Sequence, residues 1–232
     1  LVGCDSVIVF AAKKVDPKEK QTLMLYEDNV KTLENTLIAC MKLGIKNIVY
    51  LSSRCVYSNT QKSPVSENGK IAPINYYGIS KYSGELLCDY YNRIFGANIK
   101  TLRLSQVIGN DKNGYLVSMY MENAEAGKPL SVYGDSVGRR DYIYVKDACR
   151  AIWLALQKYA LCGTFNIGSG NGTTNMELAD AIVSGFCSSS EIEVHRDKKE
   201  DTSVFYLDTE KAKNELGFVC RYSLTEAFRE LS

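Results

Sequence analysis

Two groups of residues near the middle of the sequence could together remove a proton from an alcohol. Ser52 and Ser53 end the apolar run Ile48–Leu51, and Tyr77 and Lys81 follow a polar loop. Residues four positions apart share a helical face, so Lys81 would lie beside Tyr77. A nearby cation stabilises a phenolate, which lets a tyrosine act as a general base while a serine hydroxyl fixes the substrate's hydroxyl. This set suits proton removal from an alcohol whose carbon loses hydride.

The spacing of Tyr77 and Lys81 is weak evidence when taken alone. A chain with 16 tyrosines is expected to contain about one such pair by chance, and a structural tyrosine and lysine are the alternative interpretation. The surrounding order is more specific: a strand, two serines, a Val-Tyr pair, a loop with Glu67 and Pro73, and then Tyr-Gly-x-Ser-Lys. This long ordered pattern favours the catalytic interpretation.

Composition argues against several other classes of function. The chain has 232 residues, and its net charge of +1 gives no electrostatic case for a nucleic-acid partner. No apolar run approaches the ~20 residues needed to cross a bilayer, so no membrane partner is expected. The eight cysteines form no C-x-x-C pair and His195 is the single histidine. We therefore expect reduced thiols, a cytoplasmic protein and no metal site.

Hydrophobic periodicity predicts alternating strands and helices. Apolar residues at helical spacing stop at Gly44 and Gly96, which are typical helix ends. The alternation favours an α/β fold, with helices packed on the faces of a parallel sheet. The expected strands are Val7–Ala12, Ile48–Leu51, Ile99–Leu104, Leu130–Gly134, Tyr142–Val145, Thr164–Ile167, Ile192–His195 and Val204–Leu207, and the expected helices are 26–43, Ser80–Phe95, 115–126, Lys146–Tyr159, 176–187 and 209–216.

Segments on both sides of the central stretch complete a known pattern. Leu51–Tyr57 fits S-S-x-x-V-Y, and Pro73 with Tyr77–Lys81 fits P-x-x-x-Y-G-x-S-K. Further matches are Asn29-Val30, Leu102–Gly109, Arg140–Asp147, Phe165–Gly170 and Asp208–Phe218. In these segments the sequence resembles the extended short-chain dehydrogenases, specifically the NAD-dependent epimerase/dehydratase group that acts on nucleotide sugars.

The resemblance implies two interleaved parts. Residues 1–105, with 141–170 returning to them, would form the second half of a doubly wound, Rossmann-like dinucleotide-binding domain. Residues 106–140 and 171–232 would form a smaller C-terminal α/β substrate domain. The family also implies a homodimer, in which helix 26–43 and the helix that contains Tyr77 build a four-helix bundle.

The resemblance assigns catalytic and cofactor roles residue by residue. Ser53 takes the place of the catalytic Ser/Thr, Tyr77 is the acid/base, and Lys81 holds the nicotinamide ribose and lowers the pKa of the tyrosine. For Ala11 and Ala12, small residues that let a ligand approach the backbone, tight helix–sheet packing is an equally good interpretation. The residues expected at NAD, or at NADP, are Ala11, Ala12, Asn29, Leu51, Ser52, Tyr77 and Lys81.

Three residues are expected at the nucleotide sugar. Arg140 takes the place of an arginine that binds the phosphates, and a surface ion pair with Asp141 is the alternative. Gln106 replaces the usual asparagine and still offers an amide. Tyr133 stands where the family has an aromatic or apolar residue near the base, and core packing is an equally good interpretation.

The family begins with a strand and a G-x-x-G-x-x-G turn that seats the pyrophosphate of the dinucleotide. This sequence has no such motif. The glycine-rich run Gly168–Gly172 comes too late in the chain, and in the wrong context, to take its place. We expect the first three strands, roughly 60 residues, to be missing ahead of Leu1. Val7–Phe10 would then be an exposed edge strand, and the 232-residue chain would be a piece of a longer protein that binds NAD weakly and is inactive alone.

Arg54-Cys55 stands where 4,6-dehydratases of the family carry Asp-Glu, which disfavours simple 4,6-dehydration. Cys55 falls where GDP-fucose synthase and GDP-mannose 3,5-epimerase use a cysteine as acid/base, and Lys112 lies near the place of their partner base. A cysteine that only packs is the alternative.

The main hypothesis is a NAD(P)-dependent epimerase that acts on a nucleotide-diphosphate sugar through a keto intermediate. One alternative is an NADPH-dependent keto-sugar reductase. Another is a non-catalytic relative that binds a nucleotide sugar or a dinucleotide. The intact Ser53, Tyr77 and Lys81 favour an enzyme, and the absent glycine turn favours a binding protein.

Overall fold

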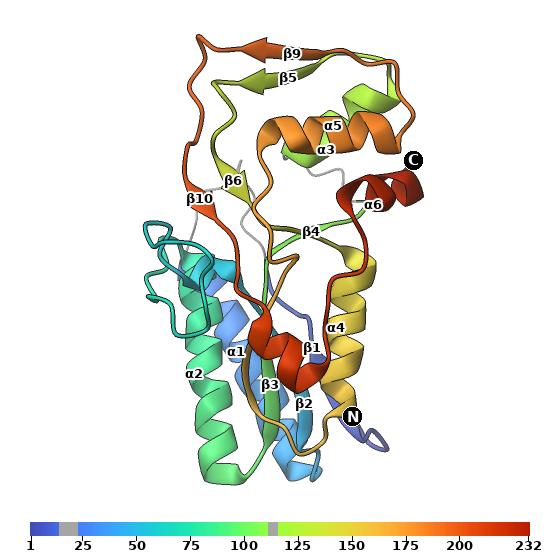
Figure 1. Cartoon of the computed structure of the whole chain (residues 1–232). Coiled ribbons are helices and arrows are strands. Elements are labelled where there is room, and N and C mark those ends of the chain that lie inside the picture. The colour runs from blue at the N-terminus through green and yellow to red at the C-terminus, as the bar shows by residue number, and fades with distance from the viewer. Residues whose placement is uncertain (14–22, 111–115) are drawn as a thin grey trace.

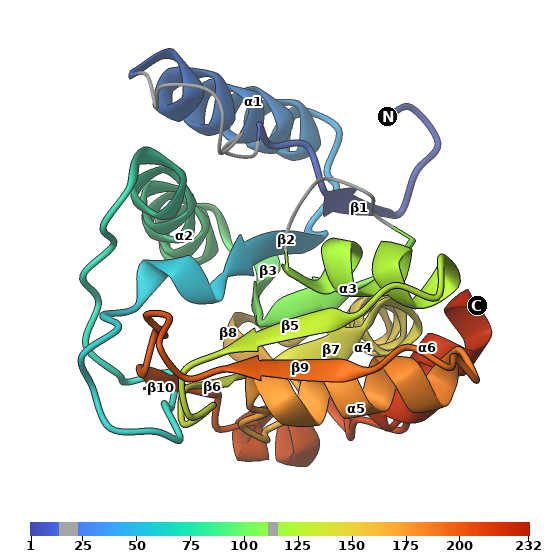
Figure 2. The same cartoon turned by 90° about the horizontal axis from the view of Figure 1, so that it is seen from above.

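The computed structural model describes residues 1–13, 23–110 and 116–232 (Figure 1). Its main sheet has four parallel strands in the order β1–β2–β3–β8. Helices α1 and α2 lie on one face of this sheet and α4 lies on the other (Figure 2). The α/β prediction is therefore confirmed. These elements are β1 Ser6–Val9, α1 Leu23–Lys42, β2 Asn47–Ser53, α2 Tyr76–Phe95, β3 Asn98–Leu104, α4 Val145–Gln157 and β8 Gly163–Ile167.

Strand β2 lies at the centre of this arrangement. All seven of its residues are buried, because neighbouring strands flank it and helices cover both faces. Strand β1 pairs with β2 and is the last strand on its side of the sheet among the described residues. This is the edge position expected for Val7–Phe10, and the Phe10 side chain is 59% exposed. The strand itself stops at Val9 rather than continuing to Ala12.

Helix α2 begins earlier than the sequence predicts. The expected start was Ser80, but the helix starts at Tyr76 because the side chain of Asn75 caps it, accepting a hydrogen bond from Gly78 N at 2.7 Å. The helix ends at Gly96, as expected, in the left-handed conformation with φ +60°. Helix α1 likewise begins at Leu23, before the predicted residue 26.

Outside the main sheet, the described residues form three two-stranded parallel sheets. Strand β7 belongs to the first of these and pairs with β4, a strand that the sequence did not predict. The C-terminal helix α6 was also not predicted. The pairs are β4 Gln106–Ile108 with β7 Tyr142–Tyr144, β5 Leu130–Tyr133 with β9 Ile192–His195, and β6 Arg139–Arg140 with β10 Val204–Phe205, and the helices are α3 Leu116–Glu125, α5 Asn175–Gly185 and α6 Leu224–Leu231.

Two short helical segments complete the fold. A single 3-10 turn, η1 Arg54–Val56, follows β2 directly, and a π-helical segment, η2 Ala212–Leu216, lies near the C-terminus. The second segment falls within the predicted helix 209–216. Its residues Ala212 and Leu216, with Phe218, pack into the core between the main sheet and α4, although the sequence grouped them with the substrate part. A second core joins α3, α5, α6 and β5.

Across residues 1–13, 23–110 and 116–232, no helix is long and apolar enough to cross a membrane.

Candidate active site

The carboxyl end of β2 lies against the first turn of α2. Ser53 is the last residue of β2, and its Oγ accepts a hydrogen bond from Cys55 N at 3.2 Å, which starts η1. Gly78 allows the close approach of the two segments, because a Cβ at this position would lie 2.4 Å from the carbonyl oxygen of Cys55. The serine turn and the start of α2 are therefore held in contact by backbone geometry.

Tyr77 and Lys81 lie one helical turn apart on α2, as their spacing predicts. The Lys81 side chain is buried; its Nζ donates a hydrogen bond to the carbonyl oxygen of Leu51 at 2.7 Å and lies 5.6 Å from the centre of the Tyr77 ring. Leu51 comes two residues before Ser53 in β2. The structure thus brings Ser53, Tyr77 and Lys81 to one place, where the main sheet meets the start of α2.

The Lys81 ammonium is in an unusual environment. Burial lowers its pKa to about 8, partly offset by nearby negative charge that includes the Glu85 carboxylate. The Tyr50 ring centre lies 5.2 Å from its Nζ. Lysines seldom titrate so close to neutral pH, and a shifted group beside a tyrosine at a strand end is a feature of functional sites.

Asn29 connects the segment after β1 to the start of α2. Its Oδ1 accepts from Lys13 N at 2.6 Å, and its Nδ2 donates to Lys13 O at 3.1 Å and to Ser80 Oγ at 3.0 Å. Ser80 Oγ donates in turn to Tyr77 O at 2.8 Å. This chain of bonds fixes the exposed residues Ala11 and Ala12, which immediately precede Lys13, relative to the start of α2.

The other two predicted cofactor residues are already engaged within the protein. The Leu51 carbonyl accepts from Lys81, and Ser52 Oγ donates to Glu85 Oε1 at 2.5 Å. Ser52 therefore turns its hydroxyl into the interior beneath α2, away from the side on which Ser53 forms its turn. Both serines are buried, but Ser53 Oγ contacts Cys55 N and not Glu85.

Arg140 lies on β6, and its partner on β10, Phe205, packs against Arg54, the residue after Ser53. Its Nη2 donates to Asp201 Oδ2 at 2.5 Å, and its Nη1 donates to the carbonyl oxygens of Arg139 and Ser203. The ion pair considered from the sequence does form, but with Asp201 instead of Asp141. Asp141 is buried and accepts hydrogen bonds from Ser169 N, Ser169 Oγ and Leu207 N, so it joins three segments of the fold.

The remaining predicted substrate residues lie on strands of two other sheets. Tyr133 ends β5, and its side chain is 48% exposed, which argues against the core-packing alternative. Its ring meets the His195 ring edge-on, with 5.8 Å between ring centres. Gln106 begins β4 and is half-buried. Lys112 lies outside the described residues.

Sequence reasoning missed two charged residues that pair with arginines. The pairing of Asp201 with Arg140 spans 61 residues, so spacing along the chain does not reveal it. Glu85 lies four residues after Lys81 and is buried in α2, where it binds Arg103 with 2.6 Å between Glu85 Oε2 and Arg103 Nη2. The available signal was an arginine, Arg103, within the apolar strand 99–104, which calls for a buried acidic partner.

The described residues fit a dinucleotide at the carboxyl end of the main sheet. The small, exposed Ala11 and Ala12 follow β1 there, and the Lys81 ammonium and Ser53 lie at the end of the neighbouring strand β2. Ligands of open parallel sheets bind at this end of the strands. The donor groups present are a cation and hydroxyls, which suit the hydroxyls of a ribose.

The model of the NAD dependent epimerase/dehydratase family matches residues 1–168 of this chain. The chain belongs to this family. UDP-glucose 4-epimerase 3 of Oryza sativa subsp. japonica is 30% identical over 254 residues, which cover 97% of this chain and 67% of the relative. The chain is thus matched along nearly its whole length, while a third of that relative lies outside the match.

Solved structures of the family have the same fold. UDP-N-acetylglucosamine 4-epimerase from Bacillus cereus superposes with a TM-score of 0.88 at 32% identity, covering 98% of this chain and 75% of that one. UDP-glucose-4-epimerase from Stenotrophomonas maltophila, solved with bound NAD and formylated UDP-arabinopyranose, gives a TM-score of 0.85 at 27% identity, with coverage of 98% and 74%. The Rossmann-like assignment of the sheet is therefore confirmed, and the family's cofactor is NAD.

Proposed function

We propose that this chain is the catalytic part of a nucleotide-sugar epimerase in which Tyr77 is the acid/base. One observation carries the proposal: the Lys81 ammonium is fixed on Leu51 O at 2.7 Å, with the Tyr77 ring 5.6 Å away and Ser53 two residues further along β2. The similarity to 4-epimerases of UDP-sugars supports a nucleotide-diphosphate sugar as substrate.

Each of the three residues has a distinct task. Ser53 Oγ positions the reacting sugar hydroxyl by a hydrogen bond. Tyr77 takes the proton of that hydroxyl as the sugar becomes a keto sugar, and returns it after the sugar has presented its other face. Lys81 is buried and positively charged, so it stabilises the phenolate form of Tyr77 electrostatically. These residues would work beside a bound NAD, which would supply a reversible hydride acceptor.

Arg140 would bind the diphosphate of the substrate. Its guanidinium is held by Asp201, whose carboxylate accepts further hydrogen bonds from Ser203 N at 3.0 Å and Ser203 Oγ at 2.7 Å. These bonds, first of all those from Ser203, lower the pKa of Asp201, so the carboxylate stays charged at neutral pH. A phosphate matches the fork of the guanidinium as well as a carboxylate does, so diphosphate and Asp201 would share or exchange this partner.

The two parts of the chain would divide the binding of cofactor and substrate between them. We propose that residues 1–105 with 141–170 hold the cofactor and that 106–140 with 171–232 hold the substrate, to which Gln106, Tyr133 and Arg140 would bind. A catalytic Cys55 stays a prediction from the family resemblance. The Cys55 backbone shapes the serine turn, through its N–H to Ser53 and its carbonyl against Gly78.

An assay of sugar interconversion tests the function and separates it from the reductase alternative. The full-length protein that contains this chain, purified and supplied with NAD and with UDP-glucose or UDP-N-acetylglucosamine, should form the 4-epimer of one of them, as followed by proton NMR of the anomeric signals. An epimerase regenerates its cofactor, so the amount of product exceeds the amount of NAD. Stoichiometric consumption of NADPH with a keto sugar, and no epimer from either substrate, would contradict the proposal and favour the reductase.

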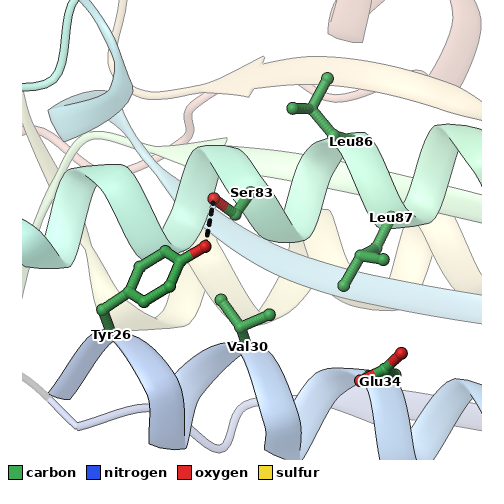
Figure 3. A pocket seen from close by; sticks show the side chains of 6 residues that line it. All are labelled: Tyr26, Val30, Glu34, Ser83, Leu86 and Leu87. Atoms are coloured by element: carbon green, nitrogen blue, oxygen red, sulfur yellow. Dashed lines mark hydrogen bonds between the residues drawn. The ribbon is translucent and has the colours of Figure 1, made fainter. Parts of the chain in front are cut away.

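We also propose a homodimer through α1 and α2. Three apolar residues of α2 at helical spacing have exposed side chains: Leu86 at 55%, Tyr90 at 45% and Ile94 at 60%. A hollow of about 290 Å³ lies between the two helices beside this face (Figure 3), bridged by a hydrogen bond from Ser83 Oγ to Tyr26 Oη at 3.4 Å. It is lined by Tyr26, Val30, Glu34, Ser83, Leu86 and Leu87.

Charge placed on this face should break the dimer. The double variant Leu86→Glu/Tyr90→Glu is expected to run as a monomer in size-exclusion chromatography with light scattering, because two carboxylates cannot be buried without partners. Ile74→Glu, at a residue 77% exposed before α2, is the matched control and should leave the mass of the dimer unchanged. A monomeric unmodified protein at micromolar concentration would contradict the proposed dimer.

A further inference from the structure

A buried ion pair lies directly behind the candidate active site. Arg103 Nη2 lies 2.6 Å from Glu85 Oε2, and Arg103 Nε donates to both carboxylate oxygens at 3.0 and 3.2 Å. Both side chains are about 95% buried. A buried pair of this kind gives little net stability, because the desolvation of two charges offsets their attraction. Its position in the fold is therefore the feature to explain.

Glu85 contacts the end of β2 and lies on the same helix as Lys81. Its Oε1 accepts from Ser52 Oγ at 2.5 Å, and Ser52 is the residue between Leu51, whose carbonyl holds Lys81, and Ser53. Along α2, Glu85 lies one turn after Lys81, on the same helical face. One carboxylate is thus bonded to the end of β2 and lies beside the lysine.

The charged and titratable groups around Lys81 come from β2, α2 and β3. The rings of Tyr50 and Tyr77 lie 5.2 and 5.6 Å from its Nζ, and Cys88 and Glu85 are the two groups that act on it by charge. Burial raises the pKa of the Cys88 thiol far above neutral, so Cys88 carries no charge when the protein functions. The Glu85 carboxylate is left as the negative charge of this set.

Arg103, on β3, contacts Glu85 and is not among the groups that act on Lys81 by charge. Its Nη1 donates to Tyr57 Oη at 2.7 Å and to Glu67 O at 2.9 Å. The guanidinium therefore fixes the carboxylate from behind and leaves Glu85 as the nearer charge to the lysine.

We propose that Glu85 is a positioning residue of the active site: held by Arg103, its carboxylate fixes the Ser52–Ser53 strand end and keeps Lys81 in its charged form. The proposal builds on the proposed function for its consequence in catalysis. Its physical core, the coupling between Glu85 and Lys81, is measurable without any turnover.

The direct test is the titration of Lys81 in the purified full chain. Side-chain ¹⁵N NMR of lysine-labelled protein reports the Lys81 amine, assigned by its loss in Lys81→Arg. Glu85→Gln keeps the size of the side chain and removes its charge, so the pKa of Lys81 should fall by about one unit. An unchanged Lys81 titration in folded Glu85→Gln overturns the proposal.

Two further variants separate charge from general damage. Asp147→Asn removes a buried carboxylate that also pairs with an arginine, Arg150 at 2.9 Å, but on α4, and should leave the Lys81 titration unchanged. Glu85→Asp keeps the charge and should move Lys81 less than Glu85→Gln does. If Glu85→Gln does not fold, Glu85→Gln/Arg103→Met removes both buried charges, and Lys81 is still expected to titrate at lower pH because Glu85 is the nearer one.

Kinetics connect the coupling to the reaction. The alkaline fall of kcat/KM should move to lower pH in Glu85→Gln by the same amount as the Lys81 titration, while Asp147→Asn keeps the original profile. A moved Lys81 titration in a protein that epimerises no nucleotide sugar would leave the coupling standing and contradict the proposed function. Epimerase activity together with an unchanged Lys81 titration would support the proposed function and contradict the coupling between Glu85 and Lys81.

Discussion

Two lysines, Lys81 and Lys100, are buried on opposite sides of the main sheet. Their side chains are almost fully buried, and burial lowers the pKa of each to about 8. Lys81 extends from α2 to the end of β2 beside Tyr77. Lys100 extends from β3 to Asn47 Oδ1 and to Lys158 O, at the end of α4.

The neighbours of each ammonium distinguish the two. The Lys100 ammonium donates a hydrogen bond to the carbonyl oxygen of Lys158, the residue after α4. Asn47 Nδ2 donates to Leu156 O at 3.0 Å. Together these two side chains cap the C-terminal end of α4. Lys81 instead faces a tyrosine at the strand end where ligands of such sheets bind. A lowered lysine pKa therefore does not identify a site, and the group that the ammonium faces decides its role.

The largest contrast is expected in activity. Lys81→Met should lower kcat/KM for epimerisation by about 10³-fold, because the phenolate of Tyr77 loses its cation. Lys100→Met should keep activity close to that of the unmodified protein, since Lys100 lies on the α4 side of the sheet. Steady-state kinetics of the two variants measure this, and an equal loss in both would remove the distinction.

A smaller contrast is expected in the pH dependence of stability. Lys100 titrates near pH 8 when folded and near pH ~10.4 when unfolded, so the unfolded chain binds more protons between these values. The free energy of unfolding of the unmodified protein should therefore rise relative to Lys100→Met as the pH increases from 8 to 10, by up to about 3 kcal/mol. Below pH 8 the difference should be constant.

Urea unfolding at several pH values checks this second contrast. The comparison with Lys100→Met cancels the titration of Lys81 and of the tyrosines, which both proteins share. A constant difference between pH 8 and 10 would show that Lys100 is not desolvated as its contacts indicate.

Local patterns predicted most of the helices and strands. Gly96 ended α2 as expected, and the buried run of β2 was recognised from its apolar residues. The start of α2 was wrong because Asn75 caps it through a side-chain bond that periodicity does not reveal. Helix α6 was missed because it has only eight residues and follows an irregular segment.

The site was predictable where its residues lie close in sequence. The spacing of Tyr77 and Lys81 predicted that the two share a helical face, and the Lys81 ammonium lies 5.6 Å from the centre of the Tyr77 ring. Their catalytic role, with Ser53, stays a prediction. Glu85 with Arg103 and Asp201 with Arg140 were not predictable as pairs, since each pair joins different elements of the fold. Which distant charges pair is decided by the tertiary fold, and a single sequence does not reveal those pairings.

The most direct test of the central claim compares two neighbouring tyrosines of α2. Tyr77→Phe removes the proposed acid/base hydroxyl, and Tyr76→Phe removes a hydroxyl from the preceding residue, whose side chain is 37% exposed. Interconversion of the UDP-sugar epimers should fall by about 10³-fold in Tyr77→Phe and remain close to the unmodified rate in Tyr76→Phe. Turnover of Tyr77→Phe within a few-fold of the unmodified protein would contradict the account.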